Sequence, residues 1–479
     1  MIEKSKKRQE LSVGENKMGT MPVGKLLISM ALPMVASMLV QALYNIVDSL
    51  YVAQISATQY EFTAISLAFA AQNFMIAVAA GTGVGINALL SKSLGEKDTD
   101  KANKIAANGV FLALCSYIVF AILGFTCMRV YMGWMTQNTE VIEFGKQYLS
   151  ICYVLSFGLF GQIVMERLMI STGKTQLAMY TQGVGAILNI ILDPIFIFED
   201  GIGHILPDAL GLDFGFGLGI AGAAIATVIG QMGAFVLGIF LNARYNKEIR
   251  LSFSGFRPSG RIIGRIYAIG VPSIVMASIG SVMNVMFNSI LNTFGPIVGD
   301  YGQKAFGAYF KIQSFIFMPV FGLNNGIVPI VAYNYGAQKR RRMMATVKYG
   351  IIYAVGYMLL GLLAFQLIPH VLVGLFLSSA DAVAVAIPCM RIISISFVFA
   401  GFCIIIGSVF QALGKSIYSM FVSIARQLVV LIPVAYILAQ FGRIELVWWS
   451  FPIAEIMSVV VSSMFFVRIY KKIVSKISE

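Results

Sequence analysis

Long apolar segments recur along this whole chain, and they constrain its fold more than any other feature. Of its 479 residues, 58% are hydrophobic and only 12% are charged, whereas an average soluble domain carries roughly 25% charged residues. A helix needs roughly 20 apolar residues to cross a hydrocarbon core of about 30 Å. Since no stretch of domain length lacks such runs, composition excludes a soluble enzyme and predicts an all-α polytopic membrane protein.

The apolar runs number twelve when each is bounded by polar residues or by Gly/Pro clusters. We therefore predict twelve transmembrane helices, near residues 26–53, 62–91, 105–129, 144–171, 175–198, 219–243, 264–292, 305–333, 345–368, 384–412, 417–440 and 446–469. The first run follows a segment that mixes Lys, Arg and Glu, and it lacks a small-residue cleavage site. These features indicate an uncleaved first helix rather than a signal peptide.

The distribution of basic residues predicts how these helices are oriented. The chain has 35 Lys and Arg against 22 Asp and Glu, a net charge of +13. With the N-terminus in the cytoplasm, basic clusters fall on the cytoplasmic side at 4–8, 92–104, 244–265, 339–342 and 468–476, whereas the opposite connections hold only Arg129, Lys304 and Arg443. Cytoplasmic loops of membrane proteins carry such an excess. We therefore expect a multi-pass protein of the plasma (inner) membrane with both termini in the cytoplasm.

The chain also resembles itself when it is shifted by about 240 residues. Pro33 then falls on Pro272, Asn45 on Asn284, Gln72 on Gln313, Gly81 on Gly322, Gly85 on Gly326, Gly95 on Gly336, and Gly173-Lys174 on Gly414-Lys415. Chance would supply one or two such matches, so we infer a duplicated architecture of two pseudo-symmetric six-helix lobes. Because six is even, both lobes share one orientation, and their symmetry axis runs along the membrane normal.

The repeat divides the chain into five segments. We assign a cytoplasmic tail to residues 1–25, the first lobe to 26–245, a cytoplasmic linker to 246–263, the second lobe to 264–470 and a cytoplasmic tail to 471–479. The linker is basic and amphipathic, and it contains Pro258 and Gly260, which is typical of a connecting loop. Two such lobes usually enclose a central site and rock against each other.

Four polar side chains of the first lobe fall at one predicted depth. Asp48 lies near the outer end of the first helix, and Asn189 and Asp193 lie one turn apart near the outer end of the fifth. Thr227, on the inward-running sixth helix, reaches nearly the same level at about 1.5 Å rise per residue. Two carboxylates in a medium of low dielectric can hold a cation or share a proton. We predict that these four residues form a site for a hard cation or a proton. Hydrogen bonding between helices is the alternative, both for Thr227 taken singly and for the two aspartates together.

Amides mark a candidate substrate cavity. Gln41 and Asn45 share one stripe of the first helix, because their spacing is four residues. The first helix of the second lobe keeps Asn284 and Asn288 but has Phe287 where the first lobe has its aspartate. We predict that the four amides line a substrate cavity, and hydrogen bonding between helices is the alternative explanation for Asn45.

Further charged residues also lie within predicted helices. Arg426 and Glu455 lie deep in the last two helices, and we predict a structural ion pair, with a gating or substrate role as the alternative. Lys311 and Arg391 lie near outer helix ends, where long basic side chains extend toward the interface. Glu166 lies near the inner end of the fourth helix. Roles for Lys311, Arg391 and Glu166 are left open.

The sequence shows no pattern for a metal or a cofactor. Its five cysteines have no CxxC spacing, and its two histidines, His204 and His370, lie in predicted loops. Neither a disulfide framework, a zinc site nor His-based catalysis is indicated. We expect no cofactor and no enzymatic activity.

Five segments resemble the multidrug and toxic compound extrusion (MATE) family. They are LNIILDPIFIF at 188–198, GIAGAAIATVIGQ at 219–231, NYGAQK at 334–339, FQALGKS at 410–416 and FPIAE at 451–455. The resemblance covers about residues 25 to 470, and it implies two six-helix lobes in a V that export lipophilic, often cationic compounds. One branch of the family couples export to an acidic site in the first lobe, and Asp48, Asn189, Asp193 and Thr227 occupy the positions of that site.

We therefore expect a secondary-active antiporter that exports lipophilic, cationic drugs or toxins in exchange for sodium ions or protons by rocking of its two lobes. One alternative is a lipid-linked oligosaccharide flippase of the same superfamily, which would favour a basic cavity. Another is a membrane-embedded transferase with paired aspartates. Asp48 and Asp193, which lie toward the outside, argue against both. The expected partners are a small-molecule substrate and the lipid bilayer, without nucleic acid, and we expect a monomer.

Overall fold

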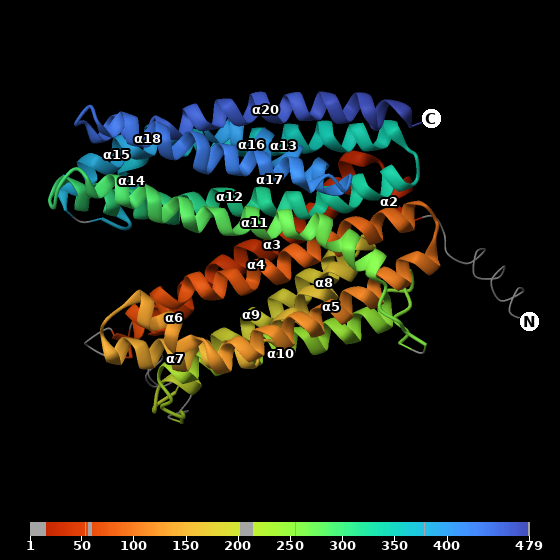
Figure 1. Ribbon diagram of the computed structural model, residues 1–479, viewed down its shortest axis with the longest axis horizontal. Coiled ribbons are helices and arrows are strands. Elements are labelled where there is room, and N and C mark those ends of the chain that lie inside the picture. The colour runs from red at the N-terminus through yellow and green to blue at the C-terminus, as the bar shows by residue number, and fades with distance from the viewer. Residues whose placement is uncertain are drawn as a thin grey trace, which may run out of the picture. The chain divides into compact units, whose positions relative to one another are not determined.

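The computed structural model describes residues 16–52, 54–55, 60–201, 214–253, 255–377 and 379–477, and these are almost entirely helical (Figure 1). Within these ranges the β-structure is limited to one isolated bridge between Gly201 and Phe214. Ten helices are long and apolar enough to cross a membrane, and the number rises to twelve if each of two bent helix pairs is one span. The prediction of an all-α polytopic fold is confirmed for this part of the chain.

Helices α2 to α10 form the first part of the described chain. They are α2 Lys17–Thr20, α3 Val23–Val52, α4 Tyr60–Gly95, α5 Thr99–Thr126, α6 Met128–Met135, α7 Thr139–Val154, α8 Phe157–Ser171, α9 Thr175–Ile197 and α10 Ile220–Tyr245. The helices α7 and α8 are bent by 47° relative to each other. Together they form the span that the sequence predicts at 144–171.

Helices α11 to α20 form the second part. They are α11 Gly260–Asn292, α12 Val298–Gly336, α13 Arg340–Leu367, α14 Pro369–Gly374, α15 Ala380–Ser394, α16 Phe397–Ala412, α17 Ser416–Ile424, α18 Ile432–Ala439, α19 Ile444–Val447 and α20 Ser450–Lys472, with a π-helix η2 at Ala425–Leu431 and a 3₁₀-helix η3 at Val474–Lys476. The helices α15 and α16 are bent by 48°. Through η2, α17 and α18 form one continuous span.

The described residues form two compact units. The N-terminal unit contains Ala36–Leu90 and Thr99–Tyr267, and the C-terminal unit contains Ser91–Asp98, Ala268–Glu479 and Met1–Val35, as far as these are described. The start of α3 therefore belongs to the C-terminal unit, where Gly322 of α12 lies against it. A Cβ atom at Gly322 would lie 2.7 Å from the backbone of Val35. Only glycine allows so close an approach of two helices.

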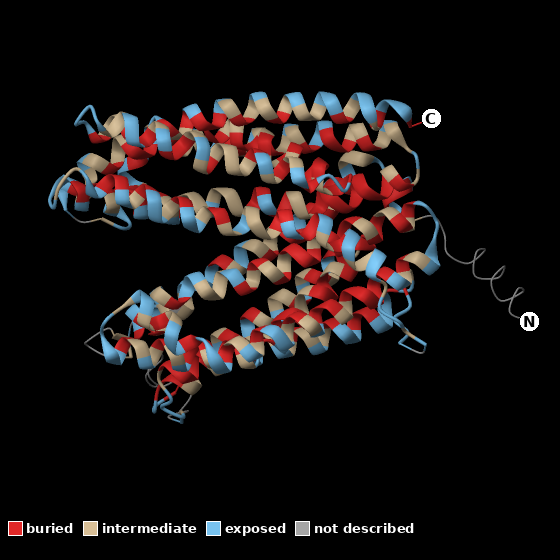
Figure 2. Cartoon of the chain, viewed as in Figure 1, coloured by how far each residue is buried: buried red, intermediate tan, exposed pale blue. Residues whose placement is uncertain are grey.

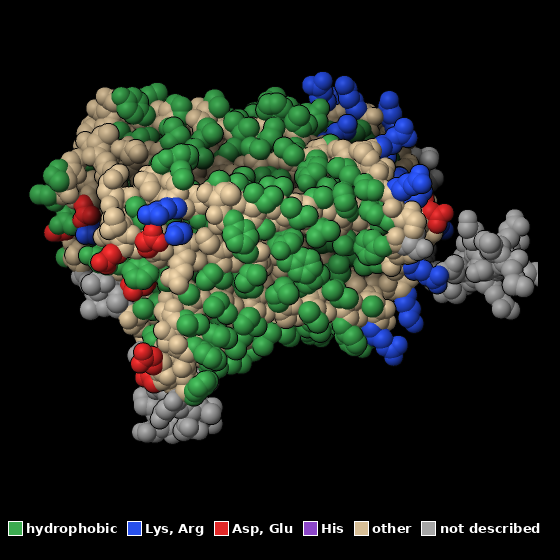
Figure 3. Space-filling view, turned by 60° about the horizontal axis from the view of Figure 1, so that its bottom comes forward, with side chains coloured by type: hydrophobic (Ala, Val, Ile, Leu, Met, Phe, Trp, Pro, Cys, Tyr) green, Lys and Arg blue, Asp and Glu red, His purple; other side chains and the backbone are tan. Residues whose placement is uncertain are grey.

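The surface of the helices fits a lipid environment. Helix faces that pack on neighbours within a unit are buried, and outward faces are exposed (Figure 2). Large apolar side chains such as Phe125, Leu32 and Leu360 are 77%, 63% and 64% exposed. On the face drawn in Figure 3, hydrophobic side chains cover the middle of the helices, and Lys and Arg gather toward helix ends. Soluble monomers rarely expose such large apolar areas.

Local geometry repeats between the two units as the sequence register predicts. Gly173 and Gly414 both have positive φ angles, 84° and 71°. After each glycine, the N–H of Lys174 or Lys415 donates to the carbonyl five residues earlier, at 2.8 and 2.7 Å. This is the Schellman cap, which requires a left-handed residue and therefore favours glycine. The matched glycines thus end equivalent helices, α8 and α16, with the same turn.

Several helix boundaries differ from those predicted, among them the starts of α12 and α11. The helix α12 begins at Val298, well before the predicted residue 305, and an ion pair of 2.6 Å between Asp300 and Lys304 lies near its start. The helix α11 begins at Gly260, inside the predicted linker, and the carbonyl of Ser259 accepts from the N–H of Ile263. The predictions followed apolar residues alone, whereas these helices extend past their apolar segments.

Candidate functional site

Asp48 lies on α3, one turn before that helix ends, and Gln41 and Asn45 share its stripe. Asp48 is half-buried, and its Oδ1 atom is shielded from solvent without a hydrogen-bond partner among the described residues. A carboxylate oxygen in this state has lost water and gained no donor, which is energetically costly. Asp48 is therefore placed to accept a cation or a proton.

The helices α9 and α10 bring the other three predicted residues together. The Nδ2 atom of Asn189 donates to Oδ1 of Asp193 at 3.1 Å and to Oγ1 of Thr227 at 3.3 Å. These side chains are 3%, 0% and 6% exposed, respectively. Asn189 directs its amide N–H groups to its two neighbours, and its own Oδ1 and the Oδ2 of Asp193 have no donor in the described residues.

Close packing of α9 on α10 keeps Thr227 beside Asn189. A Cβ atom at Gly230 of α10 would lie 2.7 Å from the carbonyl oxygen of Gly185 on α9. Glycine at this position therefore lets the two helix backbones approach closely. A larger residue would separate the helices and lengthen the hydrogen bond between Asn189 and Thr227.

The segment just before α10 holds the C-terminal end of α9. The N–H groups of Phe216, Leu218 and Gly219 donate to carbonyls in the last residues of α9 at 2.8, 2.9 and 3.0 Å. Pro194 lies inside the helix and has no N–H, so it leaves a carbonyl one turn earlier without its usual donor. Together these features fix the last turn of α9, where Asp193 lies.

Acceptor oxygens of several side chains share this cluster. Asp48 and Asp193 lie close enough to interact electrostatically, and they share the cluster with the unpartnered oxygen of Asn189. Oxygen ligands suit hard cations, and one proton shared between two carboxylates relieves their repulsion. The described residues place no group of three or more His, Cys, Asp or Glu where it could hold a metal ion. The two carboxylates and the amide oxygen provide ligands of the kind that suit one small cation or one proton.

Aromatic hydroxyls and a thiol surround this cluster. Tyr44, Tyr148 and Cys152 each interact electrostatically with Asp48. The Nε2 atom of Gln72 donates to the hydroxyl oxygen of Tyr148 at 3.3 Å. None of these residues was predicted from the sequence. Tyr44 lies one turn before Asp48, so helical spacing could have identified it, whereas tertiary packing alone brings in Tyr148 and Cys152 from α7.

The amides predicted to line a substrate cavity lie in different units. Gln41 and Asn45 belong to the N-terminal unit, and Asn284 and Asn288 belong to α11 of the C-terminal unit. The Nδ2 atom of Asn288 donates to the Oδ1 and the carbonyl oxygen of Asn284 at 2.7 and 2.9 Å. A cavity shared by all four amides remains a prediction.

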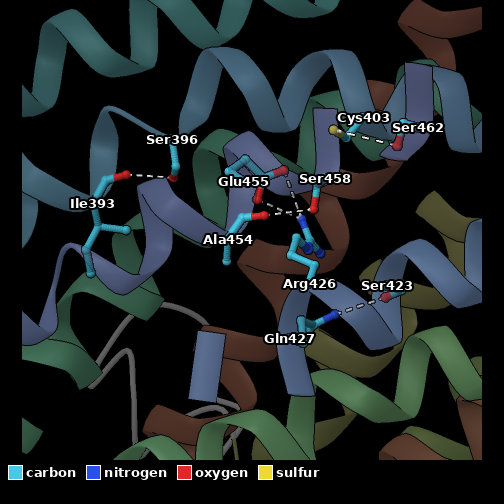
Figure 4. Close-up of polar contacts among 10 residues, drawn as sticks. All are labelled: Ile393, Ser396, Cys403, Ser423, Arg426, Gln427, Ala454, Glu455, Ser458 and Ser462. Carbon is cyan, nitrogen blue, oxygen red and sulfur yellow. Dashed lines mark hydrogen bonds and ion pairs between the residues drawn. The ribbon is translucent and has the colours of Figure 1, made fainter. Parts of the chain in front are cut away.

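Arg426 and Glu455 lie in an ion pair within the C-terminal unit (Figure 4). The Nη1 atom of Arg426 donates to both carboxylate oxygens of Glu455 at 3.3 and 3.2 Å. Because Arg426 belongs to η2 and Glu455 to α20, the pair joins two membrane spans.

The remaining charged residues have separate surroundings. Glu166 is buried on α8 and accepts hydrogen bonds from Nε2 of Gln162 at 2.9 Å and Oγ1 of Thr181 at 3.3 Å, so it ties α8 to α9. The ammonium group of Lys311 lies 5.8 Å from the centre of a phenylalanine ring. Arg391 is exposed.

The fold and the cluster define a class of protein. Duplicated helical halves with polar and ionisable groups inside the membrane are typical of secondary transporters. The MatE family model matches residues 33–195 and 272–437, which is more than half of the chain. The chain belongs to this family of MATE transporters, and it is therefore a transporter rather than an enzyme. The family match falls on both halves, in agreement with the internal repeat.

Relatives match nearly the whole chain. Over 437 residues the chain is 24% identical to the multidrug export protein MepA of Staphylococcus aureus, with 91% of each chain covered. Over 431 residues it is 25% identical to the protein of the same name from Staphylococcus haemolyticus, with 90% of each covered.

Solved structures share the fold. A multidrug resistance MATE family transporter of the MOP superfamily, in an outward-facing conformation, has a TM-score of 0.86 and 23% identity, over 96% of this chain and 99% of that one. A MOP superfamily transporter from Pyrococcus furiosus has a TM-score of 0.85 and 23% identity over the same shares of the two chains. At this level of identity the likeness establishes the fold alone.

Proposed function

We propose that this protein is a secondary-active antiporter that exports lipophilic, cationic small molecules in exchange for sodium ions or protons. The observation that carries the proposal is the cluster of Asp48, Asn189, Asp193 and Thr227, in which three buried oxygens lack donors among the described residues. Family membership supports a transport function. The two staphylococcal relatives are multidrug export proteins, which supports a drug-like substrate.

Coupling to one cation per cycle supplies enough free energy to drive export against a gradient. Moving one elementary charge through 100 mV supplies about 2.3 kcal/mol, which corresponds to a gradient of roughly fifty-fold. Coupling requires that binding of the ion weakens binding of the drug, and by reciprocity the drug then weakens binding of the ion. Asp48 and Asp193 act as the ion-binding groups in this exchange, and Asn189 and Thr227 act as neutral ligands.

The transport cycle consists of rocking between two lobes about the linker near Pro258. The internal repeat supports this motion, since parallel repeats commonly move as rigid bodies around a site between them. Cross-linking the outer ends of α3 and α11 is expected to stop transport while the protein stays folded. Undiminished efflux from a fully cross-linked sample would overturn the proposed motion.

Both termini lie in the cytoplasm in this proposal, because the basic clusters then obey the positive-inside rule. A single cysteine at position 340, in a background without other cysteines, tests the orientation. We expect a membrane-impermeant thiol reagent to label it only in opened cells. Labelling in intact cells would reverse the assigned topology.

Efflux of a fluorescent lipophilic cation from proteoliposomes tests the proposed activity, with the sodium gradient and the pH gradient imposed independently. We expect uphill efflux to follow at least one gradient and to stop when both are collapsed. Dye movement that ignores both gradients would refute ion coupling. Movement of a lipid-linked oligosaccharide without dye export would favour the flippase alternative.

A further inference from the structure

The guanidinium group of Arg426 is only partly satisfied by the protein. Its Nη1 atom donates to Glu455, whereas Nη2 and Nε make no hydrogen bond with any described residue. The side chain of Arg426 is 27% exposed, although that of Glu455 is only 8% exposed. Since arginine carries five N–H donors, the three on Nη2 and Nε are available for another acceptor.

Arg426 lies near the middle of its membrane span. It is the eleventh residue of the 24-residue span Ser416–Ala439, so about 15 Å of helix separates it from the nearer end at about 1.5 Å rise per residue. A charged group exposed to hydrocarbon at this depth is costly. The pair with Glu455 also keeps Arg426 from extending to the interface as long basic side chains otherwise do. This cost favours surroundings in which the exposed part of the Arg426 side chain faces water-accessible space rather than lipid.

A π-helix carries Arg426 at this depth. The π-helix η2 is followed by Pro433 in α18, and this proline has no N–H for the carbonyl of Val429. Local π geometry is one way in which membrane helices accommodate a proline. Such π segments are rare and frequently lie at functional sites. The sequence thus places a wide helical turn at the level of an unusual charged residue.

Further polar side chains lie around the pair of Arg426 and Glu455 (Figure 4). Tyr309 and Cys403 both interact with the carboxylate of Glu455. Gln427, the next residue of η2, is engaged with Ser423, because its Nε2 donates to Oγ of Ser423 at 3.0 Å. Because Nη1 of Arg426 donates to both carboxylate oxygens of Glu455, the planar guanidinium presents its other N–H groups in a defined direction.

We propose that Arg426 is a substrate-binding residue that recognises an uncharged acceptor oxygen, such as a carbonyl, on the exported molecule. Glu455 already neutralises the guanidinium, so a ligand carboxylate would bring an unbalanced negative charge, whereas a carbonyl needs only the free donors. The subsite selects lipophilic cations that also carry a carbonyl. This inference rests on the proposed function, because it assumes that the exported molecule reaches the C-terminal unit.

Equilibrium binding of two matched dyes to the purified protein in detergent tests the subsite. Both dyes are lipophilic cations of the same skeleton, and one carries a carbonyl where the other has a methylene group. We expect the native protein to bind the carbonyl dye about tenfold more tightly, because a hydrogen bond to a charged group is worth at least that ratio.

Two variants remove the free donors in different ways. Arg426→Met combined with Glu455→Gln removes the charge pair as a whole, and Arg426→Lys keeps an ion pair but replaces the planar fork by one ammonium group. We expect both variants to bind the two dyes with nearly equal affinity and to bind the methylene dye as the native protein does. Arg391→Gln removes another arginine of the same unit and should leave the tenfold preference intact.

A preference that survives in both variants, or an equal loss of affinity for both dyes, would overturn the subsite. Absence of any preference in the native protein would overturn it as well. Because the measurement is binding rather than transport, it is independent of the proposed activity. If the native protein binds the dyes with the expected preference but exports neither dye under any ion gradient, the proposed antiport falls and the subsite stands.

Discussion

Each half of this duplicated chain carries a polar cluster, and the two clusters leave opposite chemistry unsatisfied. In the N-terminal unit, Asp48 and Asp193 each have a buried oxygen without a donor among the described residues. In the C-terminal unit, Arg426 has N–H groups for which the described part of the chain offers no acceptor, while the carboxylate of Glu455 accepts two hydrogen bonds. The first cluster suits a cation, and the second suits an acceptor oxygen. Duplication has kept the helices and changed their chemistry.

The divergence is sharpest at the position in register with Asp48. Phe287 occupies it in the C-terminal unit and is fully buried. Its ring lies 4.7, 6.0 and 5.1 Å from the ring centres of Phe306, Trp448 and Phe451. A helix position that carries a carboxylate in one half thus fills an aromatic core in the other. Ion coupling is accordingly expected from the N-terminal unit alone.

The largest expected effect follows from neutralising either carboxylate of the N-terminal cluster. Asp48→Asn or Asp193→Asn keeps the shape of the side chain but removes its negative charge. Losing one partner of a buried charged interaction costs roughly 3 to 5 kcal/mol, so we expect uphill efflux to fall at least about 100-fold. Dye efflux from proteoliposomes at a fixed ion gradient measures this, with expression level and helix content as checks on folding.

Asp300→Asn is the matched control, because it removes a carboxylate from a helix of the other unit. Asp300 pairs with Lys304 at the surface, with side chains 49% and 53% exposed. Exposed ion pairs contribute little, and we expect efflux to stay within about twofold of the native rate. Normal ion-driven pumping by a protein with both Asp48→Asn and Asp193→Asn would move the coupling site to the C-terminal unit.

The C-terminal cluster should respond to a broken pair by losing stability. Arg426→Met leaves Glu455 as a buried charge without its partner, which is expected to lower the free energy of unfolding by about 3 to 5 kcal/mol. Adding Glu455→Gln removes that charge and should restore most of the loss. Thermal unfolding of the purified proteins compares the two. Equal destabilisation by the single and the double substitution would mean that packing, rather than charge, dominates at this position.

Much of the fold could be predicted because its signals are local. A span needs about 20 apolar residues whatever surrounds it, and the turn at Gly173-Lys174 reappears at Gly414-Lys415 because a left-handed cap favours glycine. The 47° bend between α7 and α8 was not predictable. The residues between these helices, Leu155 and Ser156, occur in straight helices too, so the bend depends on packing within the unit.

The candidate site was predictable in part, where its residues follow from helical spacing and depth. Asn189 and Asp193 are one turn apart on one helix, and depth arithmetic brought Asp48 and Thr227 to the same level. Tyr148 and Cys152 carried no such signal. Depth follows from counting residues, but the direction in which a helix presents its side chains follows from how all its neighbours pack. Residues from α7 could therefore be placed at the cluster only by the structure.

A smaller effect is expected for the neutral ligand on α10. Thr227→Ala removes the hydroxyl that accepts from Asn189 at 3.3 Å. The loss of one such hydrogen bond is worth about 1 kcal/mol, so we expect the apparent ion affinity to weaken about fivefold, with the maximal efflux rate preserved. The ion concentration at half-maximal efflux measures it. Thr227→Ser keeps a hydroxyl and should restore the native value; an unchanged value in Thr227→Ala would remove this residue from the site.

The smallest effect on coupling is expected where the C-terminal unit replaces the aspartate by a core residue. Phe287→Leu loses aromatic contacts worth about 0.5 to 1.5 kcal/mol per pair, partly compensated by the new side chain, so we expect the free energy of unfolding to fall by about 1 to 2 kcal/mol. The sodium and pH dependence of efflux should stay as in the native protein, because Phe287 binds no ion and serves only to fill the core between α11, α12 and α20. The measurement pairs thermal unfolding with ion titration of efflux on the same samples. A shift in ion dependence without a further loss of stability would contradict this division of roles between the two units. The helix position that carries Asp48 in the N-terminal unit would then influence ion binding from the C-terminal unit as well.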